Sequence, residues 1–319
     1  MGCIRAEATG YGCSDRSVIS RRQTIKVTAC VIAYNSESTI RRAITSLTCQ
    51  TYPNIEIIVY DAGSSDRTIA ILIELAQTDT RIRILRHTEQ QPWIVSANQA
   101  IEIAGGEFFM FVDADDFVDQ RYIEKLVKVL ISSNGIAAMG LVTHCDADGY
   151  YIANHPSGHR RYKFLSSSHS LVRLARFVLL PDSYGGVNLL YAVWRLTALR
   201  QIGLWQRWGE RHDDDYGFCL RAVSRGPIHQ VADTWICRTV PTVSGTDKEA
   251  TNEMLSQQIR VKRRLQLRCR HLNTPYVKQL VIHIRRNPRH SALLVVVLIR
   301  LLLGSLSLPG RLLRLRKRN

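Results

Sequence analysis

The chain has 319 residues, 45% of them hydrophobic and 22% charged, so it can bury a sizeable core and is not a disordered chain. Its net charge is +16, but residues 251–319 hold 16 of the basic residues and only one acid, Glu253, so the first 250 residues are close to neutral. A basic stretch of this kind binds anionic lipid or nucleic acid; because it is rich in Leu and poor in aromatic residues, a nucleic-acid-binding protein is the less favoured interpretation.

The first part of the chain alternates between short apolar runs and segments with helical spacing. The predicted strands cover residues 27–33, 55–60, 82–85 and 108–112, and the predicted helices between them cover residues 37–49, 66–76 and 95–104. Asp66 is a plausible N-cap of the second helix. This alternation predicts an α/β fold with a Rossmann-like, mostly parallel central sheet flanked by helices.

After residue 116 the pattern is less regular. It predicts helices at residues 120–131 and 213–223, strands at residues 136–143 and 187–193, and one or two short strands within residues 228–238. We therefore divide the chain into a disordered leader at residues 1–24, a catalytic domain at residues 25–248 and a basic helical tail at residues 249–319.

The tail changes character along its length. Residues 252–270 are basic with helical spacing, and residues 292–308 are apolar apart from Arg300, Gly304 and two serines. A spanning helix needs about 20 apolar residues, so we expect the tail to attach to an anionic membrane surface without crossing it. Packing of the apolar stretch on the catalytic domain is an alternative, and full spanning is a third.

The location of the protein is predicted from its leader and its cysteines. Residues 1–24 lack the apolar core of a signal peptide, and the eight cysteines show no Cys-x-x-Cys spacing. Reduced, structural thiols are typical of the cytosol. The sequence therefore predicts a cytoplasmic protein attached to the inner face of the cell membrane.

Acidic residues follow two of the predicted strands, where ligands bind in open parallel sheets. Asp61 ends the second strand and precedes Gly63, which favours a hydrogen bond to a base or ribose over a simple loop. Asp113, Asp115 and Asp116 follow the fourth strand. Three acids in four residues repel one another unless a cation neutralises them, so this cluster indicates a Mg²⁺ or Mn²⁺ site more than a solvated turn.

A further acidic run, Asp213 to Asp215, follows His212 at the start of the predicted helix at residues 213–223. Acids at a helix start interact favourably with the helix dipole, so a capping role is one interpretation. Three successive acids exceed what capping needs, and one of them is a candidate general base.

These residues resemble the family 2 glycosyltransferases, which have the glycosyltransferase A-type (GT-A) fold, over about residues 26–244. The motifs that carry the resemblance are Ile-Ala-Tyr-Asn at residues 32–35, residues 46–59, Asp-Ala-Gly-Ser-Ser-Asp-Arg-Thr at residues 61–68, Asn98, Asp-Ala-Asp at residues 113–115 and the acidic element at residues 214–221. The chain departs from the family pattern in four ways. A proline is missing before Tyr34, Ala62 and Gly217 replace acids, and Val240 stands where many relatives have a His.

The resemblance implies an inverting transfer of a sugar from a nucleoside-diphosphate donor, with UDP expected, to a glycan or lipid-linked saccharide in polysaccharide biosynthesis. It implies nucleotide-sugar binding by Ala33, Tyr34, Asn35, Asp61, Asn98, Asp113 and Ala114, a Mn²⁺ or Mg²⁺ on Asp113 and Asp115, and a general base at Asp215 or Asp214. A non-catalytic relative that only binds the nucleotide-sugar is the alternative. Trp205 and Trp208 could form an acceptor platform or could simply pack.

Overall fold

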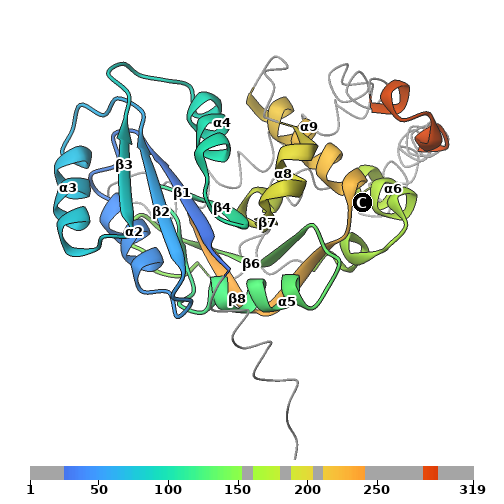
Figure 1. Ribbon diagram of the computed structural model, residues 1–319, viewed down its shortest axis with the longest axis horizontal. Helices are drawn as coiled ribbons and strands as arrows, with labels where there is room; N and C mark the ends of the chain where they lie inside the picture. Colours follow the sequence, from blue (N-terminus) through green and yellow to red (C-terminus); the bar gives the residue numbers. More distant parts are fainter. Residues whose placement is uncertain (1–24, 153–160, 180–187, 204–210, 241–282, 294–319) are drawn as a thin grey trace, which may run out of the picture.

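The computed structural model describes residues 25–152, 161–179, 188–203, 211–240 and 283–293, with the side chains of residues 178–179 and 211–216 left aside. Within them, one eight-stranded sheet has the order β3-β2-β1-β4-β7-β6-β8-β5 (Figure 1). The strands are β1 Val27–Ala33, β2 Ile55–Asp61, β3 Ile82–Arg86, β4 Phe108–Asp113, β5 Phe117–Val118, β6 Ala137–Cys145, β7 Val193–Arg195 and β8 Ile228–Thr239. The helices are α2 Ile40–Thr48, α3 Thr68–Thr78, α4 Trp93–Ile103, α5 Tyr122–Ile131, α6 Ser170–Leu179, α8 Leu196–Ile202 and α9 Arg211–Arg225. Short 3₁₀ turns are η1 Lys163–Ser166, η2 Asn188–Tyr191 and η3 Pro288–His290.

Helices cover both faces of the sheet, which explains why the central strands are apolar along their whole length. One core packs α2, α3 and α5 against the sheet, and the other packs α4, α6, α8 and α9 against its opposite face. Successive residues of β1 alternate between them: Ala29 and Val31 join the first core, and Cys30 joins the second.

The first four strands along the chain, β1 to β4, run parallel, so their carboxyl ends lie at the same edge of the sheet. Ala33 of β1 pairs with Asp61 of β2, and Ile32 of β1 pairs with Asp113 of β4. The register therefore brings the two predicted acidic strand ends to either side of β1. The other half of the sheet is mixed, because β7 runs antiparallel to both β4 and β6, whereas β6 and β8 are parallel. The predicted α/β fold is confirmed.

Several predictions about elements need correction. Residues 187–193 were expected to form a strand, but the described part of this run is the turn η2, and β7 begins only at Val193. Leu189, Tyr191 and Ala192 are all buried there. The run is therefore apolar because it is buried in a compact turn, and not because it pairs as a strand. Residues 228–238 form one long strand, β8. The leader, Trp205, Trp208, residues 252–270 and most of residues 292–308 lie outside the described residues.

A short piece of the C-terminal region packs on the sheet-bearing unit. Ile284 and Leu293 belong to the core shared by α6 and α9. His283 Nε2 lies 3.0 Å from His290 Nδ1, and His290 Nε2 lies 3.3 Å from the hydroxyl of Ser170 at the start of α6. Among the residues that the structure describes, no helix is long and apolar enough to span a bilayer.

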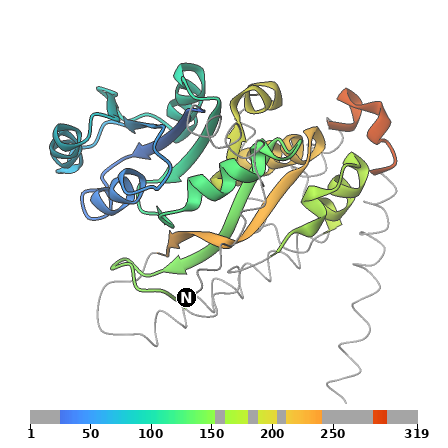
Figure 2. The same ribbon diagram turned by 60° about the horizontal axis from the view of Figure 1, so that its bottom comes forward.

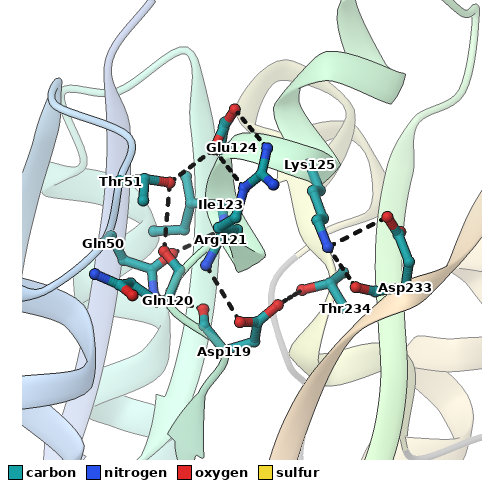
Figure 3. A network of polar contacts seen from close by, with 10 residues as sticks. All are labelled: Gln50, Thr51, Asp119, Gln120, Arg121, Ile123, Glu124, Lys125, Asp233 and Thr234. Atoms are coloured by element: carbon teal, nitrogen blue, oxygen red, sulfur yellow. Dashed lines mark hydrogen bonds and ion pairs between the residues drawn. The ribbon is translucent and has the colours of Figure 1, made fainter.

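A polar network around Gln50 fixes the start of α5 and the loop that follows the acidic cluster (Figure 3). Gln50 is 7% exposed. Its amide nitrogen donates to the carbonyl oxygens of Ser46 and Asp119 at 2.9 and 2.8 Å, and its Oε1 accepts from the Ile123 N–H at 3.0 Å. Gln50 thus satisfies one of the free N–H groups in the first turn of α5.

Gln50→Ala is expected to lower the free energy of unfolding by about 2 kcal/mol, because it leaves a buried N–H and a buried carbonyl without partners. Urea unfolding followed by circular dichroism measures this change. Thr51→Ala is the matched control, because the Thr51 side chain is exposed and bonds Glu124 at the surface; its loss should cost about 0.5 kcal/mol or less. Equal effects of the two variants would contradict a bracing role for Gln50.

Candidate functional site

The first part of the site is the buried carboxylate at the end of β2. The side chain of Asp61 is 0% exposed. Its Oδ1 accepts from the Ser64 N–H at 3.1 Å, and its Oδ2 forms an ion pair with Arg86 Nε at 3.2 Å. The carboxylate therefore stays paired inside the protein and shapes the loop after β2.

Hydrogen bonds join the loop after β1 to the loop after β2. Asn35 has a left-handed backbone, with φ of 47°. Its N–H donates to the Ser64 hydroxyl at 2.9 Å, and its Oδ1 accepts from the Ser65 N–H at 2.9 Å. Gly63 has φ of 90°, and a Cβ there would lie 2.8 Å from the backbone of Glu89. The two loops thus form a fixed wall at the carboxyl edge of the sheet.

Asp66 strengthens this wall in a way that differs slightly from the prediction. The N-cap position of α3 is Arg67, so Asp66 precedes it. Its Oδ1 accepts from the Thr68 N–H at 2.9 Å, and its Oδ2 accepts from the Glu37 N–H at 3.1 Å. Asp66 therefore has a structural role at the helix start and a link to the neighbouring loop.

The second part of the site is a cluster of three carboxylates after β4. Ligand oxygens of Asp113, Asp115 and Asp116 all lie within 4.8 Å of one another. Asp113 is exposed, Asp115 is half-buried and Asp116 is buried. Asp116 Oδ1 accepts from the Thr239 N–H at the end of β8, at 2.8 Å. The cluster thus joins the end of β4 to the end of β8.

Two residues that the sequence did not indicate complete this cluster. The Tyr191 hydroxyl donates to Asp113 Oδ2 at 2.7 Å, and the Arg238 guanidinium carbon lies 5.3 Å from the centre of the Tyr191 ring. Arg238 Nε is 3.8 Å from Asp116 Oδ2, which is an ion pair but too long for a hydrogen bond. Within the described part of the chain, neither of these two buried atoms has a hydrogen-bond partner.

The charges of this cluster are unevenly balanced. Burial, and then the charge of Asp113, raise the pKa of Asp115. Burial and the charges of Asp113 and Asp115 hold the pKa of Asp116 well above its usual range. Burial and the charge of Asp113 likewise raise the pKa of Tyr191, which keeps its hydroxyl protonated as the donor to Asp113. The guanidinium groups of Arg238 and Arg42 lower the pKa of Asp115, but they do not outweigh burial and the repulsion among the three acids.

The residues present fit a hard divalent cation. Such ions take oxygen ligands, and Mg²⁺ in particular is held by one or two carboxylates together with substrate phosphates. Asp113 and Asp115 offer accessible carboxylates, and the unpartnered Oδ2 of buried Asp116 adds negative potential behind them. A bound cation would also relieve the repulsion that raises the pKa values of Asp115 and Asp116.

The other predicted site residues lie in three different settings. The side chains of Ala33 and Ala114 are buried in the core, so only their backbone atoms can reach a ligand. Tyr34 is 43% exposed at the end of β1. Asn98 is half-buried in the second turn of α4, which packs on β1 and β2.

Asp214 and Asp215 lie in the first turns of α9, and their side chains are outside the described part of the structure. The helix itself is positioned by Phe218, whose ring packs edge-on against Trp194 of β7, with ring centres 5.5 Å apart. α9 also packs against η2, the turn that carries Tyr191. Its backbone therefore runs beside the element that contacts Asp113.

Two family models match the chain. One, described as glycosyl transferase family 2, matches residues 28–186, and the other, glycosyl transferase family group 2, matches residues 108–313. An uncharacterized glycosyltransferase of Haemophilus influenzae is 40% identical over 114 residues, which are 36% of this chain and 35% of that protein. The Escherichia coli glucosyltransferase WfgD, which is named for transfer from UDP-Glc to α-D-GlcNAc-diphosphoundecaprenol, is 33% identical over 102 residues, 32% of this chain and 40% of WfgD.

A crystal structure of S. aureus TarS in complex with UDP resembles the fold, with a TM-score of 0.52 and 19% sequence identity over 68% of this chain and 61% of the TarS chain. The two curated relatives are thus matched over only about a third or slightly more of their length. The family match over residues 28–186 includes β1 to β4 and the acidic cluster.

Proposed function

The chain belongs to the family 2 glycosyltransferases, and from this we propose that it moves a sugar from a nucleoside-diphosphate donor, most simply a UDP-sugar, to a glycan or lipid-linked saccharide in polysaccharide biosynthesis. The observation that carries the proposal is the convergence of Asp61, Asp113 and Asp115 at one edge of the sheet, beside the wall formed by the two loops after β1 and β2. The UDP complex of TarS and the UDP-Glc named for WfgD support the choice of nucleotide.

We assign the donor side of the site as follows. The loops after β1 and β2 form the surface for the base and ribose, with Tyr34 and Asn35 on it and with Asp61 holding the second loop in shape from inside the protein. The backbones of Ala33 and Ala114 and the side chain of Asn98 contribute to the same nucleotide-sugar site. Asp113 and Asp115 would hold Mn²⁺ or Mg²⁺ at this edge of the sheet. Bound there, the cation offsets the negative charge that develops on the leaving nucleoside diphosphate.

The chain's own residues then prepare and complete the transfer. Tyr191 fixes the orientation of the Asp113 carboxylate through the 2.7 Å hydrogen bond, so less reorganisation is needed when the donor binds. Asp215, or Asp214 beside it, removes the proton from the acceptor hydroxyl. The acceptor oxygen attacks the anomeric carbon from the face opposite the nucleotide, the bond to the diphosphate breaks, and the configuration inverts.

Titration of the full chain with UDP, GDP and dTDP, each with and without Mn²⁺, tests the donor assignment by calorimetry. We expect UDP to bind at least about tenfold more tightly with Mn²⁺ than without it, which corresponds to about 1.4 kcal/mol. Asp115→Ala should remove this difference while the protein stays folded. Tight, metal-independent binding, or no binding of any nucleotide by a folded sample, would contradict the proposal.

The attachment of the protein completes the proposal. We place it at the inner face of the cell membrane, with residues 25–248 as the catalytic domain and the basic residues 251–319 directed to anionic lipid, because a lipid-linked acceptor has its saccharide at that surface. The non-catalytic alternative is separated from this proposal by turnover: a binding-only relative would take up UDP with Mn²⁺ but release none from any UDP-sugar.

A further inference from the structure

The charge of the folded unit is more uneven than the sequence total indicates. The described segments at residues 161–179, 188–203 and 283–293 contain no Asp or Glu, whereas residues 211–240 hold Asp213, Asp214, Asp215 and Asp233. Residues 25–152, in contrast, hold acids and bases together and form several ion pairs between them. The positive charge is therefore not confined to the C-terminal stretch, because part of the folded unit is basic as well.

Much of this charge lies at one end of the molecule, formed by η1, α6 and residues 283–293, which we call the basic end. Figures 1 and 2 both show α6 and residues 283–293 next to each other, at the end remote from α3. The exposed basic residues of this end are Lys163, Arg176, Arg285, Arg286 and Arg289. Two apolar side chains of α6, Leu171 at 39% and Val172 at 45%, are exposed beside them.

The segment at residues 283–293 presents its arginines on a fixed support. Its His283, Ile284, His290 and Leu293 side chains are buried against α6 and α9, whereas Arg285, Arg286 and Arg289 point to solvent. The Asn287 N–H donates to the His283 carbonyl at 3.0 Å, and the Ser291 N–H donates to the Pro288 carbonyl at 3.0 Å. The arginines are thus held close together by the backbone that carries them.

Among the described residues, this end brings positive groups together and contains no Asp or Glu. Burial, then His290, Arg221 and Arg289, lower the pKa of His283 to about 4, and burial, Arg289 and Arg173 lower the pKa of His290. Within the described residues, no ion pair includes Arg285, Arg286 or Arg289. An external anionic surface would relieve this repulsion.

We propose that the basic end is a docking surface for anionic phospholipid headgroups, and that it sets the orientation in which the catalytic domain rests on the membrane. This inference builds on the proposed function and specifies which face of the folded unit meets the lipid. Leu171 and Val172 favour lipid over nucleic acid, because apolar side chains among basic side chains suit the boundary between headgroups and acyl chains. The exposed aromatic residues in the described part of the chain, on which nucleotide bases could stack, lie elsewhere, at Tyr34, Tyr150, Tyr151 and Trp235. The apolar run of residues 292–308 also follows this segment directly in the sequence.

Sedimentation of the full chain with phosphatidylcholine vesicles, with and without one quarter phosphatidylglycerol, tests the proposal. The triple variant Arg285→Gln, Arg286→Gln, Arg289→Gln should bind the anionic vesicles about 100-fold more weakly, since each base near an anionic surface contributes about a factor of five. The control is Arg67→Gln, Arg83→Gln, Lys128→Gln. It removes the same charge from exposed positions outside the basic end and should change binding less than about threefold.

The outcomes separate the possible explanations. Equal weakening by both triple variants would show a response to net charge alone and would overturn the proposal, as would no weakening by the first. Binding of a single-stranded RNA that depends on Arg285, Arg286 and Arg289, with vesicle binding unchanged, would also overturn it. Calorimetry with UDP and Mn²⁺ on the parent chain and the same variants distinguishes failure of this proposal from failure of the proposed function. If the parent chain does not bind nucleotide, the proposed function is refuted. If the first triple variant alone loses vesicle binding, the basic end is still supported as the lipid-binding surface.

Discussion

Asp113→Asn is expected to lower kcat/KM for sugar transfer by about 10³-fold, because in the proposed site it removes one of the two carboxylates that would hold the cation, and with it positive charge that would offset the leaving diphosphate. Asp113 is the exposed member of the acidic cluster. It ends β4 next to β1, so it lies on the side of the cluster that is nearest to the loop after β1. Asn keeps the size of the side chain and can still accept from the Tyr191 hydroxyl, so the fold is preserved. Release of UDP from a panel of UDP-sugars with Mn²⁺ measures the effect.

Tyr191→Phe is the matched variant, because it changes the hydrogen bond to Asp113 Oδ2 without changing the charge of Asp113. It removes the hydroxyl that donates to Asp113 Oδ2 but keeps the ring beneath Arg238. One hydrogen bond to a charged group is lost, so kcat/KM should fall about tenfold, and the Mn²⁺ concentration for half-maximal rate should rise. If Asp113→Asn retains activity within a factor of ten of the parent, the carboxylate is not at the reacting diphosphate and the donor assignment is wrong.

The half of the fold that carries β1 to β4 could be predicted from the sequence because β1, β2 and β4 are buried on both faces and read as apolar runs. β3 lies at the edge of the sheet and exposes Arg83 and Arg86. The helices between the strands show one apolar side, as in Ile40, Ile44 and Leu47 of α2. The bounds of the four strands differ from the predicted ones by no more than one residue at either end.

α6 escaped prediction for a physical reason that is visible in its side chains. Arg173 is 2% exposed and donates to the carbonyl oxygens of Val223 and Ser168, whereas Leu171 and Val172 face solvent. Leu174 and Phe177 of α6 are buried as hydrophobic periodicity requires, but the buried arginine and the two exposed aliphatic residues weaken the pattern. Leu171 and Val172 are also the apolar residues of the basic end.

The candidate site was predictable only where its residues are close in sequence. Asp113, Asp115 and Asp116 form a visible cluster, and the end of a predicted strand indicated their place. Tyr191 and Arg238 are far along the chain, and only the return of η2 and β8 to the end of β4 brings them to the acids. The sequence offered no signal for Tyr191, which an apolar run explained. For Arg238 the family resemblance indicated only the neighbourhood, through Val240 at the position where many relatives have a His.

Asp215→Asn is expected to lower kcat by about 10³-fold, the upper part of the range for a lost general base, with little change in UDP affinity. Asp214→Asn should lower kcat less than about tenfold. The difference follows from helix geometry: Asp214 and Asp215 are successive positions of α9, so they point about 100° apart around its axis. Only one of them can face an acceptor hydroxyl bound at the edge of the sheet.

The pH dependence of kcat distinguishes loss of the general base from loss of a negative charge that only stabilises the N-terminus of α9. A general base must be unprotonated to act, so the parent enzyme should lose activity as pH falls through the pKa of this carboxyl group in the complex, and Asp215→Asn should lose that limb of the profile. A helix-start charge contributes to stability instead, and its removal lowers Tm without altering the shape of the profile. If Asp214→Asn shows the larger fall and the altered profile, the base is Asp214. If both variants keep most of their activity, the proton acceptor does not lie on α9, and the acids at its start serve the helix alone.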